Sequence, residues 1–360
     1  MYNGSYIGKL GYTLVKSELK HEDVQKIKKD LFVKPFVPKC IQQVCDPFPI
    51  FRESTSKYYL PRFYGIQHFG EPKSYKILKN ENIHLKFNGS LRDYQYNIAN
   101  KYITHVSDKG GALLEMDTGM GKTVLALYIL AQLNVKTIIL VHKEFLLNQW
   151  VERIQEFLPD AKIGRIQGKT IEVEGYDIVM GMIQSISTKD YENIFDKFGL
   201  TIIDEVHHMG AEVFSNALNK IVTRYTLGLS ATMKRKDGLS CVFKMFLGDI
   251  LHSEKRDTSE VSVLVNKMEY KVNDSEFNEV ILDYRGNPSY VKMISKVCEY
   301  NPRNEFILEI IGDIVKNKDA HIILLAHNKS MLKYLYEAIS FRKICEVGYY
   351  IGGMKEEELK

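Results

Sequence analysis

The chain has 360 residues and a net charge of +4; 45% of its residues are hydrophobic and 26% are charged. These values are ordinary for a globular protein, and the length allows two or three domains. No run of eighteen apolar residues occurs, and the N-terminus lacks the apolar core of a signal peptide. A soluble intracellular protein, in the cytosol, the nucleus or a virion, is therefore the default expectation.

The five cysteines are scattered and contain no CxxC pair, so we interpret them as reduced thiols. Cys40 and Cys45 lie close together, but no second pair of cysteines and no suitably spaced histidines complete a zinc site. The sequence therefore predicts no structural metal.

Residues 1–88 are predicted to form a small α+β domain, with a helix over 17–29 and β-like stretches over 6–15 and 57–65. Residues 1–90 hold 15 Lys/Arg and 8 Asp/Glu, a balance of +7, whereas the rest of the chain has a balance of −3. This asymmetry indicates either contact with a polyanion or simply a solvated lysine-rich surface.

Residues 89–255 alternate apolar, strand-like runs with amphipathic helices, which is typical of an α/β fold with a parallel sheet covered by helices on both faces. Residues 256–360 contain a second, shorter β/α series. Strands are expected at 261–272, 321–327 and 346–353, and helices at 303–317 and from Lys329.

The segment Met116–Leu130, MDTGMGKTVLALYIL, follows a strand-like run and opens a helix, as a phosphate-binding loop does. Gly119 and Gly121 allow the backbone to approach phosphates, which the helix N-terminus also attracts. Lys122 is predicted to neutralise the β- and γ-phosphates, and Thr123 to offer its hydroxyl to Mg²⁺. The predicted ATP-binding residues of this loop are Thr118, Gly119, Met120, Gly121, Lys122 and Thr123. Met116 stands where the full motif has glycine.

An apolar run ends at Asp204 and Glu205, and ligands of parallel sheets bind at the carboxyl ends of strands. Asp204 is predicted to hold Mg²⁺ and Glu205 to polarise an attacking water. Together with Lys122 they form the predicted catalytic set.

Six motifs appear in a fixed order: LRDYQ, TGMGKT, VHKEFLLNQW, IVMGMIQSI, IIDEVHH and LGLSATMKRKDGL. They resemble the motifs of superfamily 2 helicases. The similarity is strongest to the branch that contains the XPB-like helicases and the transcript-release helicases of poxviruses and other large DNA viruses. This resemblance implies tandem RecA-like motor domains over 89–255 and 256–360, with ATP and Mg²⁺ as cofactors.

The resemblance also implies roles for individual residues. Arg92 and Gln95 would contact the adenine base. Backbone contacts to nucleic acid are implied for His142, Lys143, Gly181 and Gln184. Trp150 is interpreted mainly as a core residue.

The motif LGLSAT would couple phosphate release to domain movement through Ser230, Ala231 and Thr232, and His207 could link the ATP site to it. Met233 replaces a proline that many relatives have, and we expect a mild effect. A zinc pair of His207 and His208 is not expected, because adjacent residues at a strand end point to opposite sides.

In the C-terminal series, Asn328 is implied to touch nucleic acid. Gly352 and Gly353 could do so too, or could form a plain turn. No arginine of the sequence lies in the family's arginine-finger motif. We therefore expect the second motor domain to be incomplete, the gene product to be longer, and this chain to bind ATP but hydrolyse it poorly.

The sequence thus predicts an ATP-dependent helicase or translocase that acts on DNA rather than RNA. The basic N-terminal domain would grip a duplex or, alternatively, cover the first motor domain. Three other interpretations remain open: an RNA helicase, a non-motor P-loop switch, and an ATPase subunit activated by RNA polymerase or another transcription protein. The residue usage suits an AT-rich genome, so a viral source and packaging in a virion are also expected.

Overall fold

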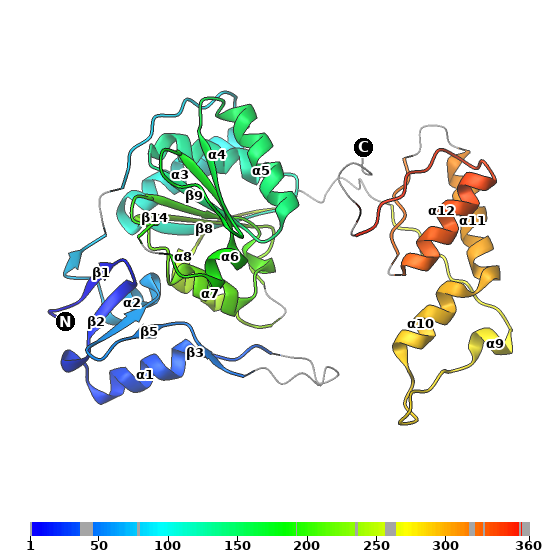
Figure 1. The fold of residues 1–360 in the computed structure, drawn as a ribbon, viewed down its shortest axis with the longest axis horizontal. Coiled ribbons are helices and arrows are strands. Elements are labelled where there is room, and N and C mark those ends of the chain that lie inside the picture. Colours follow the sequence, from blue (N-terminus) through cyan, green and yellow to red (C-terminus); the bar gives the residue numbers. More distant parts are fainter. Residues whose placement is uncertain are drawn as a thin grey trace. The chain divides into compact units, whose positions relative to one another are not determined.

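The computed structural model describes residues 2–36, 46–77, 80–191, 193–234, 237–255, 264–316, 321–326, 328–352 and 354. The chain divides into two compact units, Met1–Glu260 and Val261–Lys360 (Figure 1). No helix among the described residues is long and apolar enough to cross a membrane. Cys40 and Cys45 lie outside the described residues.

The centre of the first unit is an eight-stranded sheet with the order β11-β10-β12-β9-β13-β14-β8-β15. Its strands are β8 (Gly111–Met116), β9 (Thr137–Val141), β10 (Ile163–Gln167), β11 (Thr170–Ile171), β12 (Ile178–Met182), β13 (Leu200–Ile203), β14 (Tyr225–Ser230) and β15 (Ile250–Glu254). All neighbours pair in parallel except β10 and β11. The predicted parallel sheet is therefore confirmed, while β10, β11 and β15 were not predicted.

Helices cover both faces of this sheet because successive strand residues point to opposite sides. Ala112, Leu114 and Met116 of β8 pack with helices α3 (Asp93–Lys109), α4 (Lys122–Leu133) and α5 (Glu144–Phe157). Leu113 packs on the other side, in the cluster that includes side chains from α7 (Ala211–Leu218) and α8 (Ser240–Leu247). Helix α6 (Ile183–Thr188) contributes to the same second cluster. This is a RecA-like arrangement of one parallel sheet between two helical layers.

The N-terminal part of the first unit has its own five-stranded sheet, with the order β5-β6-β2-β1-β7. Its strands are β1 (Tyr6–Gly8), β2 (Gly11–Val15), β5 (Arg52–Glu53), β6 (Lys57–Leu60) and β7 (Ser74–Tyr75). Helix α1 (His21–Leu31) follows the short helix η1 (Lys16–Glu18), and β3 (Phe32–Val33) pairs with β4 (Phe48–Pro49).

The predicted β-like stretch 57–65 is wrong in its second half, because helix α2 (Arg62–Phe69) begins there. Pro61 precedes the helix with φ −52°. Proline cannot donate to a strand ladder, whereas its φ suits the start of a helix. Gly65 of α2 packs directly on Tyr12, since a Cβ at Gly65 would lie 2.1 Å from the tyrosine ring.

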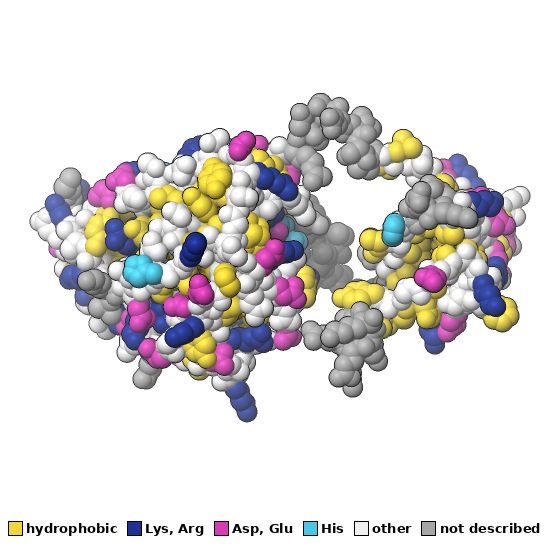
Figure 2. Space-filling view, turned by 90° about the horizontal axis from the view of Figure 1, so that it is seen from above, with side chains coloured by type: hydrophobic (Ala, Val, Ile, Leu, Met, Phe, Trp, Pro, Cys, Tyr) yellow, Lys and Arg dark blue, Asp and Glu magenta, His cyan; other side chains and the backbone are white. Residues whose placement is uncertain are grey.

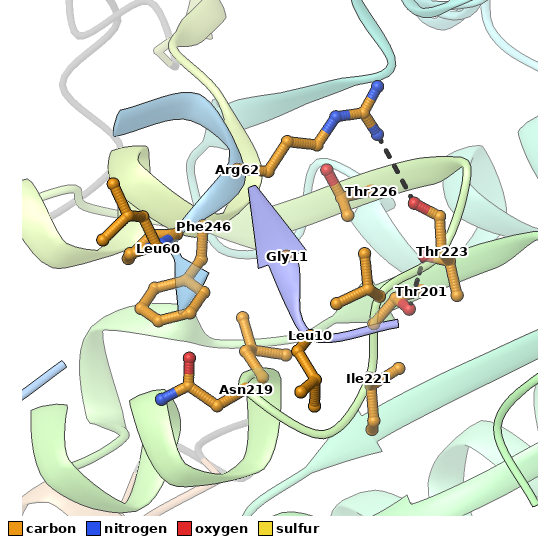
Figure 3. Close-up of a pocket in the computed structure, with 13 residues that line it drawn as sticks. Leu10, Gly11, Leu60, Arg62, Thr201, Asn219, Ile221, Thr223, Thr226 and Phe246 are labelled. Atoms are coloured by element: carbon orange, nitrogen blue, oxygen red, sulfur yellow. Dashed lines mark hydrogen bonds between the residues drawn. The ribbon is translucent and has the colours of Figure 1, made fainter. Parts of the chain in front are cut away.

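Arg62 joins this N-terminal part to the amino-terminal edge of the large sheet (Figure 3). Its Nη1 donates to the carbonyl of Arg224 at 2.8 Å and to that of Thr223 at 3.4 Å. Glycine at position 110 makes space for this guanidinium group, because a Cβ there would lie 2.1 Å from Nη2 of Arg62. The contact lies at the edge opposite the loops that carry the predicted ATP-binding motifs.

The second unit is described mainly by helices: α9 (Ser275–Asn278), α10 (Tyr290–Glu299), α11 (Asn301–Val315) and α12 (Lys329–Phe341). The two predicted helices are confirmed as α11 and α12. The predicted strands are not confirmed, because residues 264–272, 321–326 and 346–352 form no strand. The segments 321–325 and 345–350 line the same groove without pairing, so their backbones do not form a strand ladder.

That groove has a volume of about 760 Å³, and most of its lining residues are aliphatic or tyrosine. Ile323 and Leu325 are 85% and 87% exposed along it. Hydrophobic side chains are visible together on the surface of this unit (Figure 2). An exposed apolar surface of this kind is typical of an interaction site.

Helices α11 and α12 are joined by Glu305, which accepts two hydrogen bonds from Arg342, at 2.7 and 2.8 Å, and one from Tyr334 at 2.9 Å. These donors lower the pKa of Glu305 from 4.5 to about 2, Arg342 being the main cause. A carboxylate whose pKa is lowered by folding stabilises the folded state above its unfolded pKa. That contribution is lost as the pH falls from 4.5 towards 2.

We therefore expect Glu305→Gln to lower the stability of the second unit at pH 7 and to remove part of its acid sensitivity between pH 4.5 and 2. Urea unfolding followed by circular dichroism at several pH values measures both effects. Asp313→Asn is the matched control, because Asp313 pairs with Lys316 within the same helix. Equal acid sensitivity in the wild type and Glu305→Gln would contradict this role.

Candidate functional site

The predicted phosphate-binding loop connects β8 to α4 at the carboxyl edge of the large sheet. Gly119 and Gly121 have φ values of 83° and 75°, which glycine adopts readily. A Cβ at Gly121 would lie 2.5 Å from Nε2 of Gln95, so the amide of Gln95 would have to shift. The loop therefore requires glycine at position 121 mainly for its backbone conformation.

Lys122 begins α4 and is 9% exposed. Its ammonium group donates to the Met116 carbonyl at 3.1 Å and lies 3.7 Å from Oε1 of Glu205. The lysine is thus held between the strand that precedes the loop and the carboxylate after β13. Thr123 follows it in the first turn of α4 and is half-buried.

Asp204 and Glu205 follow β13 directly, and Asp204 is 7% exposed. The indole Nε1 of Trp150 donates to Oδ2 of Asp204 at 2.8 Å, and the backbone N–H of Glu205 donates to Oδ1 at 2.9 Å. Burial raises the pKa of Asp204, and the charge of Glu205 raises it further, against the opposing hydrogen bond from Trp150. A cation beside Asp204 would relieve this cost, so the donor set fits Mg²⁺.

Glu205 has a left-handed backbone conformation, with φ 50° and ψ 51°. Such a conformation costs a non-glycine residue about 1–3 kcal/mol and is concentrated at functional sites. Its Oε2 is buried, accepts no hydrogen bond from the described residues, and lies 3.3 Å from Nδ1 of His207. The carboxylate is therefore positioned towards the phosphate loop on one side and His207 on the other.

His207 connects this carboxylate to β14. Its Nδ1 lies 2.6 Å from Oγ of Ser230, and that hydroxyl donates to the carbonyl of Thr232 at 2.6 Å. A serine hydroxyl has one hydrogen to donate, so the hydrogen between His207 and Ser230 belongs to Nδ1. Ser230 is fully buried and Ala231 and Thr232 are half-buried. The predicted coupling residues are thus in direct contact with His207.

Gln95 lies in the first turn of α3 and is 4% exposed. Its Nε2 donates to the carbonyls of Met120 and Gly121, at 3.0 and 3.3 Å, and its Oε1 accepts from the backbone N–H of Arg92 at 2.9 Å. Tyr94 also donates to the Met120 carbonyl, at 2.9 Å. Gln95 therefore supports the phosphate loop in this structure, and its contact with adenine stays a prediction.

Lys143 and Gln184 are exposed near the carboxyl ends of the neighbouring strands β9 and β12. Nε2 of Gln184 donates to the carbonyl of His142 at 2.9 Å. The Nδ1 of His142 is buried without a partner among the described residues, and burial lowers the pKa of this imidazole. These three residues form one patch, the strand-end patch, at the same edge of the sheet as the phosphate loop.

The position of Gly181 does not favour the predicted contact with nucleic acid. Gly181 is buried within β12, and a Cβ there would lie 2.8 Å from Ile186 and 2.9 Å from Leu140. Its small size therefore serves packing. Asn328, in the second unit, caps α12 by accepting from the backbone N–H groups of Ser330 and Met331. Gly353 lies outside the described residues.

From the sequence, we expected no zinc pair of His207 and His208 because adjacent residues at a strand end point to opposite sides, and that reason is wrong. Both residues lie in the short helix η2 (Val206–His208), not on a strand, and their ring centroids are 3.9 Å apart. One ligand atom from each histidine and one from Glu205 lie within 4.8 Å of one another.

Two contributors to the site were not predicted. Trp150 is a core residue, as expected, but its indole also holds Asp204. Tyr94 lies inside the LRDYQ motif and supports the phosphate loop through its hydroxyl. The Trp150–Asp204 contact joins residues 54 positions apart, so no local pattern could indicate it.

Comparisons with known proteins place this site in a family. Residues 88–235 match the family described as type III restriction enzyme, res subunit. A protein of Acanthamoeba polyphaga mimivirus, named as an ATP-dependent RNA helicase (L396), is 34% identical over 368 residues, covering 98% of this chain and 70% of the relative. The chain belongs to the superfamily 2 helicases. This family uses ATP, which agrees with the geometry of the phosphate loop.

Two further relatives of this superfamily 2 helicase are similar over shorter stretches. Helicase 161L of Invertebrate iridescent virus 6 is 29% identical, over 63% of this chain and 54% of the relative. The DNA 3′-5′ translocase XPB2 of Sulfurisphaera tokodaii is 30% identical, over 67% of this chain and 53% of the relative. The chain thus spans about half the length of these two proteins.

Proposed function

We propose that this superfamily 2 helicase is an ATP-driven motor that moves along DNA, either separating strands or displacing bound complexes. The observation that carries the proposal is the contact chain from Glu205 through His207 to Ser230. A catalytic carboxylate linked to a second motif allows the state of the nucleotide to change the position of another segment. A non-motor switch would need no water-activating carboxylate at this position.

In the proposed reaction, the backbone N–H groups of the phosphate loop and the ammonium group of Lys122 hold the phosphates of ATP. Glu205 polarises the water that attacks the γ-phosphate. Mg²⁺, when bound, would neutralise phosphate charge, and Thr123 and Asp204 are the residues that would hold it. Loss of the γ-phosphate changes what Lys122 and Glu205 contact, and His207 transmits this change to Ser230.

The strand-end patch of His142, Lys143 and Gln184 is the proposed first contact with nucleic acid. It would bind phosphate and sugar, which positions a strand without reading its sequence. The names of the relatives include both an RNA helicase and a DNA translocase. We propose DNA because many members of the XPB-like branch that the motifs resemble move on duplex DNA.

A second candidate is an ATPase subunit that needs a protein partner, such as RNA polymerase or another transcription protein. The exposed apolar groove of the second unit favours it, because such a surface is suited to a protein partner.

One experiment distinguishes these functions. ATP turnover by the full-length gene product is measured without nucleic acid and with single-stranded DNA, duplex DNA or RNA added separately, with Asp204→Asn as the inactive control. Stimulation by DNA, lost in the control, is the expected result, and stimulation by RNA alone would make the protein an RNA helicase. Equal turnover under all conditions would overturn the motor and favour the partner-dependent subunit.

A further inference from the structure

The outer face of the N-terminal sheet carries aromatic and basic side chains in register. Strand pairing places Arg52 opposite Tyr59, Tyr59 opposite Thr13, and Thr13 opposite Tyr6. These residues therefore form one row across four neighbouring strands. Lys57 lies two residues before Tyr59 on the same face, because side chains alternate along a strand.

The inner face of the same sheet is apolar and covered. Its alternate residues Ile7, Tyr12, Leu14, Tyr58 and Leu60 are at most 4% exposed and share a cluster with Ile27 and Leu31 of α1. On the outer face Thr13, at the centre of the row, is 1% exposed, whereas the flanking Tyr6 and Tyr59 are half-buried.

Tyr6 lies down along the sheet instead of standing away from it. A Cβ at Gly8 would lie 3.0 and 3.3 Å from ring atoms of Tyr6, so the ring covers the glycine. The ammonium groups of Lys76 and Lys57 lie 4.2 and 5.4 Å from the ring centroid, and Lys57 also donates to the Tyr6 hydroxyl at 3.2 Å. The half-buried Tyr6 ring therefore packs on Gly8, with the Lys76 ammonium over it and Lys57 at its hydroxyl.

These cations are not neutralised within the part of the chain that the structure describes. No carboxylate there pairs with Arg52, Lys57 or Lys76, whereas the nearby Lys16 pairs with Glu53. Lys57 and Lys76 lie at Tyr6, and Arg52 lies three strands away, opposite Tyr59. A polyanion with flat rings of its own would supply both the charge and a stacking partner.

We propose that Tyr6, Tyr59, Arg52, Lys57 and Lys76, the tyrosine platform, bind a single strand of nucleic acid. Phosphates contact the lysine and arginine side chains, and a base stacks on Tyr6 in the position that the Lys76 ammonium occupies in this structure. The platform rests on the proposed function, since it adds a second nucleic-acid contact outside the motor core. The sequence led us to expect that the basic N-terminal domain binds a duplex, whereas the platform would bind a single strand.

The test measures the affinity of the whole chain, without nucleotide, for a short single-stranded oligonucleotide at several salt concentrations. Tyr6→Leu should weaken binding about 5- to 150-fold without changing the salt dependence, because stacking carries no charge. Tyr6→Phe should bind nearly as the wild type. The double variant Lys57→Gln/Lys76→Gln should reduce the slope of log affinity against log salt by about 1.4, roughly 0.7 for each phosphate contact.

The matched control is Lys28→Gln/Lys29→Gln on α1, which removes two exposed charges on the covered side of the sheet. It should leave the salt slope unchanged. Equal affinity and equal salt slope in every variant would overturn the platform. So would a second result: polyglutamate displaces the oligonucleotide, and Tyr6→Leu leaves the affinity for the oligonucleotide unchanged. The binding assay contains no ATP, so it tests the platform separately from the motor. Platform-dependent binding, together with ATP turnover that nucleic acid does not stimulate, would contradict only the motor proposal.

Discussion

Lys122→Ala is expected to lower the affinity of the chain for ATP by about 10- to 150-fold. The change removes a charged donor to phosphate, and hydrogen bonds to charged groups contribute about 1.5–3 kcal/mol. Titration with a fluorescent ATP analogue measures the effect. In the nucleotide-free protein the change removes the hydrogen bond from Lys122 to the Met116 carbonyl and the 3.7 Å contact of Lys122 with Glu205. The thermal stability should therefore change little.

Lys136→Ala is the matched control, because Lys136 is also a buried lysine, at 1% exposed. Its ammonium group bonds to Glu81 and to the carbonyl of Val173, at 3.0 and 2.8 Å. This variant should lose stability and keep its ATP affinity. An unchanged ATP affinity in Lys122→Ala would show that the loop after β8 does not bind phosphate.

Glu205→Gln is expected to bind ATP at least as tightly as the wild type and to hydrolyse it about 10²- to 10⁴-fold more slowly. Amide and carboxylate have the same shape, but only the carboxylate can draw a proton from water, a contribution of that size. Removing the negative charge beside Lys122 also takes away one of the like charges near the phosphates. Single-turnover hydrolysis separates the chemical step from binding.

Glu212→Gln provides the comparison, since Glu212 is an exposed carboxylate in the first turn of α7, close in sequence to the site. Its turnover should match that of the wild type. Normal hydrolysis by Glu205→Gln would exclude Glu205 as the water-activating group, despite its strained backbone and its contact with His207.

The sequence predicted the α/β fold of residues 89–255 well because the sheet is buried on both faces and its strands are nearly continuous apolar runs. The phosphate loop, Asp204 and Ser230 each stand at the end of such a run, so they could be placed at the carboxyl edge before any geometry was known. The contact between His207 and Ser230 was also expected, from the resemblance to the helicase family.

What the sequence could not show depended on contacts between distant residues. The bond from Trp150 to Asp204 leaves no local pattern. The row of the tyrosine platform arises from strand pairing, which residue order alone does not reveal. In the second unit, apolar runs such as 321–326 have the residue types that are common in strands. A strand, however, also needs a neighbouring strand with which its backbone can pair.

The central claim is that the ATP site and the nucleic-acid contacts are coupled. It is tested most directly by measuring the nucleic-acid affinity of Glu205→Gln with and without saturating ATP. The two affinities should differ by about 5- to 150-fold, and nucleic acid should change the ATP affinity by the same factor. His207→Ala should bring that factor towards one. Equal affinity with and without ATP would contradict the motor, because a nucleotide that favours neither state cannot drive movement.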